Sequence, residues 1–198
     1  MCNEKVSYGD AEPPGVRPLD GVTVEAIEIY QNPKLQSVDF GLGIWPVNPY
    51  YNGFSLNAGY TRNFSKTYSW EVINGDYVFT IDKGLTSELA ESFDVNPERI
   101  ERINFLISSN LRYTHSYGKT IFLKEYIRYF RSAILAGPAL LATQKGGSMN
   151  ARVGINFGWR VETFINDDFS WKFELRDTYA FGGFGNNITL IFGSAYGF

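Results

Sequence analysis

Opposite charges alternate along two neighbouring segments near the end of the chain, residues 151–164 and 170–181. Every second residue of these segments is polar or Gly, and the charged ones are Arg152, Arg160, Glu162, Lys172, Glu174 and Arg176. Carboxylates beside basic groups can exchange protons in catalysis. They can also pair across strands and fill the inside of a narrow barrel, where Gly154 and Gly158 would leave room for the long side chains. We interpret the six residues as packing inside a barrel.

Other chemistry finds little support in the sequence. One Cys and one His cannot build a zinc site, and we expect His115 to be a surface residue of its strand. The sequence has no Ser/His/Asp arrangement beyond chance and no phosphate-binding Gly loop. Gly43-x-Trp45 resembles a lipocalin motif only weakly, and a formal charge of −3 gives no reason to expect nucleic acid. We therefore predict no enzyme, no catalytic residue, no metal site and no cofactor.

The elements that must position these charges are strands, because large apolar residues recur at every second position. Aromatic residues make up 17% of the chain, which also contains 20 Gly, a composition that fits an all-β protein with aromatic girdles. No apolar run reaches the roughly 18 residues of a membrane-spanning helix. About eight strands are expected, at 37–45, 54–63, 68–81, 104–115, 128–144, 151–164, 170–181 and 188–198.

Some stretches interrupt this alternation. Residues 84–103 have helical spacing and predict a helical insertion, and 116–127 predict a turn with a short amphipathic helix. The phase slips at Asn74-Gly75, which predicts a bulge. Residues 128–144 are apolar on both faces, so the pattern does not orient them.

The first residues differ in composition from the rest. We assign 1–36 to an N-terminal tail and 37–198 to the barrel, because 9–21 is rich in Pro, Gly and charge. Residues 22–31, VTVEAIEIYQ, alternate weakly and could add an edge strand or dock against the main body. If Met1 was added to the natural chain, Cys2 would be the first residue of a mature lipoprotein and would carry a lipid. Otherwise Cys2 is an incidental free thiol.

Alternation alone does not say which face is inside. A soluble lipocalin-like carrier of an apolar ligand would turn its apolar face inward, whereas an outer-membrane barrel turns it outward. Charged residues and Gly on the polar face favour the membrane barrel. So do aromatic residues near strand ends, which suit the membrane interface. We expect these on the outer face: Trp45, Tyr60, Phe64, Tyr68, Trp70, Tyr113, Trp159, Phe164, Trp171, Tyr179 and Phe181.

The chain ends with ITLIFGSAYGF at residues 188–198. Outer-membrane barrels end in a closing strand of the form polar-x-Gly-x-x-apolar-x-apolar, which the insertion machinery reads. Gly193, Tyr196 and Phe198 occupy the last three marked places of this signal. Ile191 stands where a polar residue is expected, so the match is imperfect.

Several stretches in fixed order resemble the outer membrane beta-barrel domain family that is frequent in myxobacteria and Bdellovibrio-type predators. They are NPYYNGFSLNAGYTRNFSKTYSWEVINGDYVF, GLTSELAESFDV, LISSNLRYTHSYGK and FELRDTYAF followed by NNITLIFGSAYGF. The resemblance implies an eight-stranded antiparallel transmembrane β-barrel in the outer membrane. It also resembles the porin-like branch, whose members are thought to form rings that enclose lipid.

These observations lead to one main functional expectation, a non-enzymatic outer-membrane barrel. The partners that we expect are membrane lipid, the insertion machinery and further copies of the chain. Polar residues on apolar faces, Asp177, Ser109 and Ser194, would lie at a contact between protomers; otherwise Asp177 lies near the membrane boundary. An even number of strands places both termini on the periplasmic side. A monomeric surface-recognition barrel, with 84–103 as its contact, remains an alternative.

Overall fold

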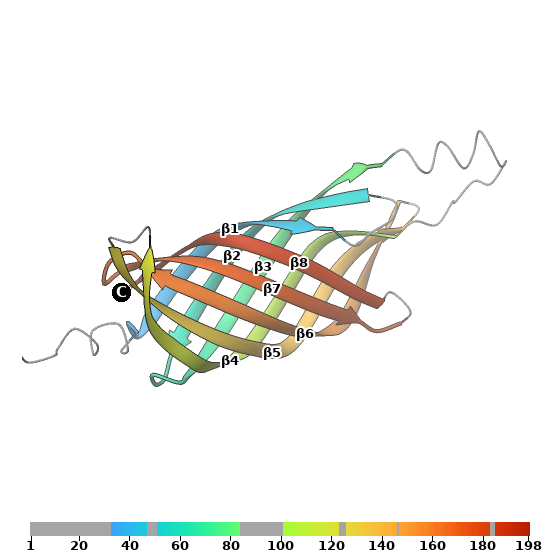
Figure 1. Ribbon diagram of the computed structural model, residues 1–198. Helices are drawn as coiled ribbons and strands as arrows, with labels where there is room; N and C mark the ends of the chain where they lie inside the picture. The colour runs from blue at the N-terminus through green and yellow to red at the C-terminus, as the bar shows by residue number, and fades with distance from the viewer. Residues whose placement is uncertain (1–32, 47–50, 84–100, 123–125, 146, 183–184) are drawn as a thin grey trace, which may run out of the picture.

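The computed structural model describes residues 33–46, 51–83, 101–122, 126–145, 147–182 and 185–198. These residues form eight antiparallel strands in chain order. They are β1 (Gln36–Trp45), β2 (Tyr51–Asn63), β3 (Tyr68–Asp82), β4 (Arg102–Phe122), β5 (Tyr126–Lys145), β6 (Ser148–Phe164), β7 (Phe169–Ala180) and β8 (Gly185–Gly197). Each strand pairs with the next, and β8 pairs with β1, so the sheet closes into a barrel (Figure 1). The eight-stranded antiparallel barrel expected from the alternation is thereby confirmed.

The closing seam joins β1 to β8 from Ser37↔Gly197 to Ile44↔Leu190. Gly41 lies opposite Gly193 in this seam. A Cβ on Gly193 would come within 2.1 Å of the Phe40 carbonyl oxygen and 2.6 Å of the Gly41 Cα. The two strands therefore approach closely at a point where only a residue without a side chain fits.

The described part of the N-terminal segment and the C-terminus lie at one end of the barrel (Figure 1). The turns between β2 and β3 and between β6 and β7 lie at the same end, as does the β4–β5 hairpin. We call this the terminal end, and the opposite end the loop end. Among the described residues, no helix is long and apolar enough to cross a membrane.

The prediction of a short helix over residues 116–127 is wrong. Residues 116–122 continue β4, and β5 begins at Tyr126, with pairs from Ser116↔Ser132 to Phe122↔Tyr126. Lys119 and Tyr129 lie opposite each other in this hairpin and make a cation–π contact of 5.1 Å. The cross-strand pairing of aromatic and β-branched residues has thus prevailed over a weak helical spacing. Of the predicted insertion 84–103, residues 84–100 lie outside the described residues, while Arg102 and Ile103 belong to β4.

The bulge in β3 lies at Val72, slightly before the predicted Asn74-Gly75. Tyr60 pairs with Ile73 and Thr61 with Glu71, so Val72 is the additional residue. The β3–β4 register shifts at the same place. Because of the bulge, Glu71 and Asn74 both turn inward, although they are three positions apart.

Two aromatic residues predicted on the outer face point inward instead. Trp45 is 6% exposed and packs over Gly53, its partner on β2, where no side chain competes for the space. Phe164 shares the inward register of Glu162, and its ring lies 5.7 Å from the Arg131 guanidinium. Both residues stand one position out of phase with the apolar series of their strands.

Candidate functional site: the charged lumen and the apolar outer wall

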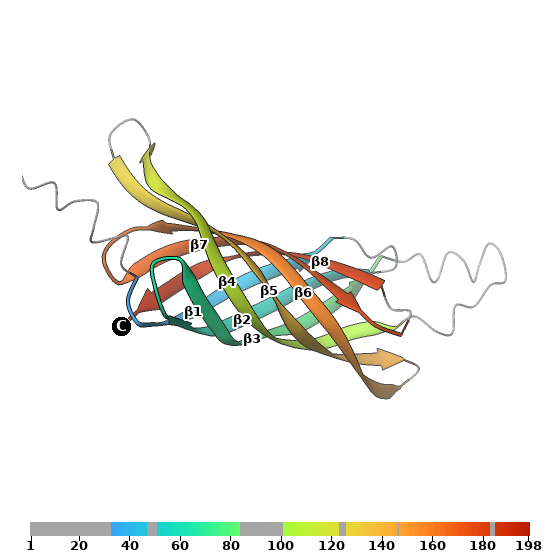
Figure 2. The ribbon, with the colours of Figure 1, turned by 90° about the horizontal axis from the view of Figure 1, so that it is seen from below.

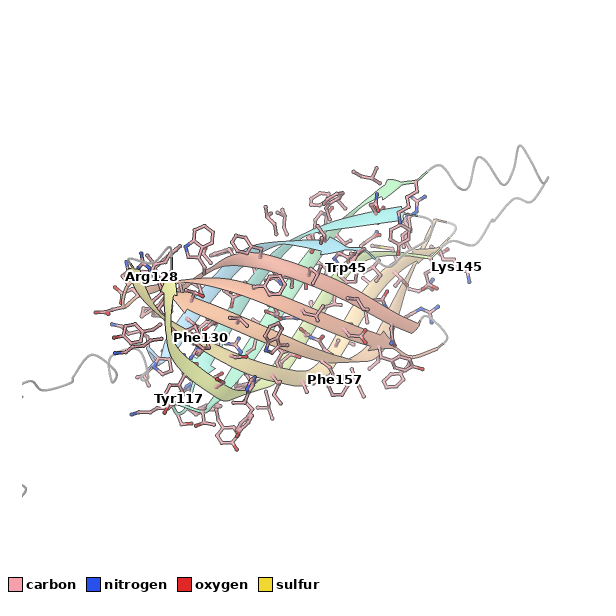
Figure 3. All side chains as sticks on the ribbon, viewed as in Figure 1. Trp45, Tyr117, Arg128, Phe130, Lys145 and Phe157 are labelled. Atoms are coloured by element: carbon pink, nitrogen blue, oxygen red, sulfur yellow. The ribbon has the colours of Figure 1, made fainter. Side chains whose placement is uncertain are left out.

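The outer wall of the barrel is made of exposed apolar side chains. Leu42 on β1, Leu111 on β4, Phe157 on β6 and Phe192 on β8 are each more than half exposed. In water such a continuous apolar surface would be unfavourable, because large exposed apolar patches drive association or insertion into a lipid phase. Figure 3 shows side chains that project outward from the barrel, among them Phe157.

Aromatic side chains are frequent on the wall, and some of them pair with one another toward the strand ends. At the terminal end, Tyr68 and Tyr113 have ring centroids 5.4 Å apart, and Trp171 and Phe192 have centroids 5.1 Å apart. At the loop end, the same kind of contact joins Tyr179 and Phe181 at 5.6 Å. β7 has 12 residues, which at about 3.3 Å each and a tilt near 40° span roughly 30 Å. The whole strand thus spans the thickness of a bilayer's hydrocarbon core.

The inside of the barrel is charged and buried. Ten charged side chains point inward with at most 9% of their surface exposed. Five are acidic, Asp39, Glu71, Asp76, Glu162 and Glu174, and five are basic, Arg112, Arg131, Arg160, Lys172 and Arg176. The formal charges of this set cancel, which is the condition for ions to remain buried at a tolerable cost.

Glu71 lies at the centre of this network. Its carboxylate oxygens are 3.4 Å from Arg112 Nη2, 3.5 Å from Arg160 Nη1 and 3.3 Å from Arg176 Nη2. Asn110 Nδ2 donates to Glu71 Oε2 at 2.6 Å. One carboxylate on β3 therefore connects β4, β6 and β7 across the lumen.

Further ion pairs of the same network centre on Arg160 and Lys172. Arg160 Nη2 is 2.6 Å from Glu162 Oε1, and Arg160 Nη1 is 3.5 Å from Asp39 Oδ2. Lys172 Nζ forms an ion pair with Asp39 and donates to Asn57 Oδ1 at 2.7 Å. Asp39 is fully buried, so these contacts replace the water that a carboxylate would otherwise require.

Of the six lumen residues proposed from sequence, the structure brings Arg160, Glu162, Lys172, Glu174 and Arg176 together. Arg152 lies apart, toward the loop end, where its Nε and Nη2 donate to the two carboxylate oxygens of Glu101 at 2.6 and 2.7 Å. The hydrogen bonds from Arg152 hold the pKa of Glu101 below its usual value.

Sequence reasoning did not select the other half of the network as a site. Asp39 and Arg112 alternate with apolar neighbours on β1 and β4, and Glu71 stands between Trp70 and Val72. This alternation is the signal that could have found them. The face on which Asp76 and Arg131 lie was harder to assign. A bulge precedes Asp76, and Arg131 lies near the start of a strand that is apolar on both faces.

Both ends of the charged region are closed by other side chains. Toward the loop end, Trp45, Val78, Ile103, Leu106, Leu141 and Ala180 form an apolar cluster inside the barrel. Toward the terminal end, Arg131 pairs with Glu162 at 2.5 Å, and Lys34 spans part of the opening to reach Asp168 at 3.2 Å. The interior is thus filled along its length, as expected for a barrel of eight strands. The described residues therefore fill the space in which a lipocalin-like carrier would hold its apolar ligand.

The three polar residues proposed at a protomer contact all lie on the outer wall. Ser109 Oγ accepts a hydrogen bond from Trp70 Nε1 at 3.0 Å, which gives this hydroxyl a partner within the chain. Ser194 lies between Phe40 on β1 and Trp171 on β7. Asp177 lies between Phe157 and Ile188, and its Oδ1 is buried without a hydrogen-bond partner.

The one histidine also lies on the outer wall, beside a serine. Ser132 Oγ is 2.9 Å from His115 Nε2 and accepts a hydrogen bond from Trp159 Nε1 at 2.7 Å. Sequence reasoning missed this contact, because the two residues are 17 positions apart. A hydrolytic site would also need a group that orients the imidazole and donors for an oxyanion. The described residues place an indole there instead, so the three side chains tie β4, β5 and β6 together. Within the same residues, no cluster of His, Cys, Asp and Glu could hold a metal ion.

The insertion signal proposed at the C-terminus divides between the two faces. Tyr196 and Phe198 are exposed on the outer wall at the terminal end, with stacked rings 6.5 Å apart. Gly193 faces inward in the seam with β1. Ile191, which departs from the signal, is completely buried and covers Gly41 in the lumen. The apolar residue at this place therefore packs inside the barrel. Cys2 lies outside the described residues.

Comparisons with known proteins find likeness in shape only. No protein-family model and no curated protein matches the chain. Among solved structures, the chain is similar to the N-terminal β-barrel domain of Pseudomonas aeruginosa OprF, with 12% identity over 83% of this chain and 98% of that one and a TM-score of 0.49. It is similar to Ail, the attachment invasion locus protein of Yersinia pestis, with 10% identity over 83% and 97% and a TM-score of 0.43. For Neisserial surface protein A the identity is 12% over 82% and 94%, and the TM-score is 0.40.

Proposed function

We propose that this chain is a non-enzymatic, porin-like barrel of the bacterial outer membrane. The observation that carries the proposal is the inversion of the usual soluble pattern: charged side chains are buried inside and apolar side chains are exposed outside. In water, burying the charges and exposing the apolar wall would both be unfavourable. This arrangement is favourable only where lipid surrounds the barrel. A closed sheet also leaves no unpaired backbone in the hydrocarbon layer.

Membrane residence is tested by fractionation and by gel mobility. The chain, expressed with an export signal, should sediment with outer membranes and resist extraction by carbonate or urea. It should migrate faster without boiling than after boiling, because the closed barrel stays folded in detergent. A chain that appears in the soluble periplasmic fraction would contradict the proposal.

We further propose that protomers assemble into a ring that organises or encloses membrane lipid. Because the lumen is filled, any larger opening must lie between protomers. The supporting feature is the placement of polar residues on the wall. Asp177 and Ser194 belong to β7 and β8, and Ser109 belongs to β4, on the opposite side of the closed strand order. A head-to-tail contact between two different sides of a protomer generates a ring when the rotation between neighbours closes.

Asp177→Leu distinguishes this assembly from a lipid-facing carboxylate. If Asp177 faces a neighbouring protomer, the variant should lose cross-linked oligomer in native membranes while the monomer keeps its gel shift. If Asp177 faces lipid, the variant should fold at least as stably and cross-link as before, since a charge on the lipid face is unfavourable. Phe157→Leu, at the neighbouring wall position on β6, is the matched control. A native-mass measurement in mild detergent that finds only monomers would refute the ring.

A further inference from the structure

The β4–β5 hairpin extends beyond the rest of the barrel at the terminal end (Figure 2). β3 pairs with β4 only as far as Tyr68↔Tyr113, and the Thr114 N–H donates to the Thr67 carbonyl at 2.7 Å. Beyond this point, the described residues provide β4 with one neighbour, β5. Residues 116–122 thus have an open edge on the side away from β5.

An open edge carries backbone donors and acceptors that can pair with another strand. The segment SYGKTIF is suited to this, because it is rich in aromatic and β-branched residues and contains no Pro. Its one charged residue, Lys119, lies over the Tyr129 ring on β5, so it leans away from the open edge. Natural edges are usually blunted by such a charge, and this one is not.

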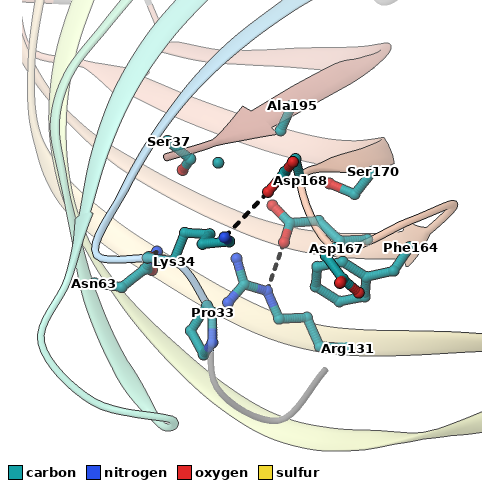
Figure 4. Close-up of a pocket in the computed structure, with 12 residues that line it drawn as sticks. Pro33, Lys34, Ser37, Asn63, Arg131, Phe164, Asp167, Asp168, Ser170 and Ala195 are labelled. Carbon is teal, nitrogen blue, oxygen red and sulfur yellow. Dashed lines mark hydrogen bonds and ion pairs between the residues drawn. The ribbon is translucent and has the colours of Figure 1, made fainter. Parts of the chain in front are cut away.

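The chain enters the described structure at the same end of the barrel as this edge. Pro33 and Lys34 line a small pocket at the terminal mouth together with Arg131 and Phe164 (Figure 4). Arg131 pairs across the hairpin with Tyr117, near the base of the open edge. Asn63 Nδ2 donates to the Lys34 carbonyl at 2.6 Å, which fixes the chain at this position. Whatever precedes Pro33 therefore starts within reach of residues 116–122.

The direction and length of the preceding segment also fit. β4 runs away from the barrel body between residues 116 and 122, whereas residues 22–31 run toward Pro33. A segment that lies along this edge is consequently antiparallel to β4, the arrangement with the better hydrogen-bond geometry. At about 3.3 Å per residue, residues 22–31 extend for roughly 33 Å and the edge for roughly 23 Å.

The charges of the two segments are complementary. Residues 22–31 contain Glu25 and Glu28 and no basic residue. Residues 116–122 of β4 contain one charged residue, Lys119, and no acidic residue, and Arg128 lies on the adjacent β5. Opposite charges across neighbouring strands stabilise pairing modestly and disfavour wrong partners.

We propose that residues 22–31 add to the open edge of β4 as a further antiparallel strand outside the membrane. This strand covers the exposed backbone of residues 116–122 and holds the N-terminal tail beside the hairpin. The proposal concerns the hairpin alone and does not depend on the assembly of a ring.

Amide hydrogen exchange of the full-length protein in detergent micelles or lipid nanodiscs tests the pairing. In the unchanged chain, the outward-directed amides of residues 116–122 should be protected. In the double variant Val24→Pro/Ile27→Pro, which cannot donate along the strand, they should exchange at least about tenfold faster. Val16→Pro, a Pro substitution in the same tail but outside the segment, is the matched control and should leave the protection unchanged.

Two results would overturn the proposal. Equal exchange of residues 116–122 in the unchanged chain and the double variant would show that the edge is open in solution. Protection that falls on dilution would show that the tail of another copy occupies the edge. Protection of the β7 amides, far from the hairpin, reports in each sample that the barrel itself is folded. A second measurement in a Cys2→Ser background pairs Lys119→Cys with single Cys substitutions at 24–30, where intrachain disulfide yields should alternate with a period of two.

Discussion

Replacing Glu71 with Gln should destabilise the barrel more strongly than any comparable change at its rim. The substitution keeps the shape of the side chain and removes its charge, so that Arg112, Arg160 and Arg176 lose a shared carboxylate at 3.3–3.5 Å. At an effective dielectric constant of 20, each such contact is worth on the order of 4 kcal/mol before desolvation. Because the desolvation of the carboxylate is also removed, we expect a net loss of about 3–5 kcal/mol.

Equilibrium unfolding by urea in lipid vesicles measures this loss, with tryptophan fluorescence and the gel shift as two readouts. Asp168→Asn is the matched control, because it makes the same acid-to-amide change in an ion pair with Lys34 whose partners are each 48% exposed. That variant should lose less than about 1 kcal/mol. Glu71→Gln combined with Arg112→Gln restores the charge balance of the lumen and should recover part of the loss. If Glu71→Gln unfolds within 1 kcal/mol of the unchanged chain, or the second substitution only adds to the loss, the charge argument is wrong.

Three further predictions concern the seam, the loop end and the C-terminus. Gly193→Ala should destabilise the barrel by about 1–3 kcal/mol, because its Cβ would clash with backbone atoms of β1. Gly75→Ala, whose Cβ would meet its nearest atom at 3.7 Å, is the control. Equal unfolding free energies for the two variants would contradict this prediction. Because the pKa of Glu101 is lowered on folding, its pair with Arg152 stabilises the barrel above the unfolded pKa of about 4.3, and this contribution is lost as the pH falls through the folded pKa. Glu101→Gln should therefore weaken the dependence of the unfolding free energy on acidic pH, by less than about 1 kcal/mol. If the variant kept the same dependence on acidic pH, this role of Glu101 would be contradicted. Phe198→Ala should slow assembly into the outer membrane of living cells yet leave spontaneous folding into detergent unchanged, whereas an equal defect in both would identify Phe198 as a packing residue only.

The alternation of the strands made the barrel and its inverted polarity predictable. A period of two places Asp39, Arg160 and Lys172 on one face of their strands and Phe40, Trp159 and Phe173 on the other, whatever the rest of the chain does. The aromatic residues near strand ends and the C-terminal strand indicate a membrane location. The sheet is then expected to close into a barrel, since an open edge in lipid is unfavourable.

Places where the period shifts were not predictable from the sequence. One residue more or less turns every later side chain to the other face, so the bulge at Val72 decides that Glu71 and Asn74 both point inward. Trp45 and Phe164 point inward for a related reason, because each stands out of phase where Gly53 or the opening of the lumen leaves space. The helical spacing of 116–127 was overridden by pairing between two strands, a contact that no local pattern contains.

The sequence by itself determined the class of the protein: strands of membrane length that are charged on one face and apolar and aromatic on the other. Only the tertiary structure decided which charges meet. Glu71 has contacts with Arg112, Arg160 and Arg176, which lie 41 to 105 positions away in the chain. It meets them because barrel closure and strand stagger bring four strands to one level of the lumen. Spacing along a strand fixes the face on which a side chain lies, whereas the register between strands fixes its partner.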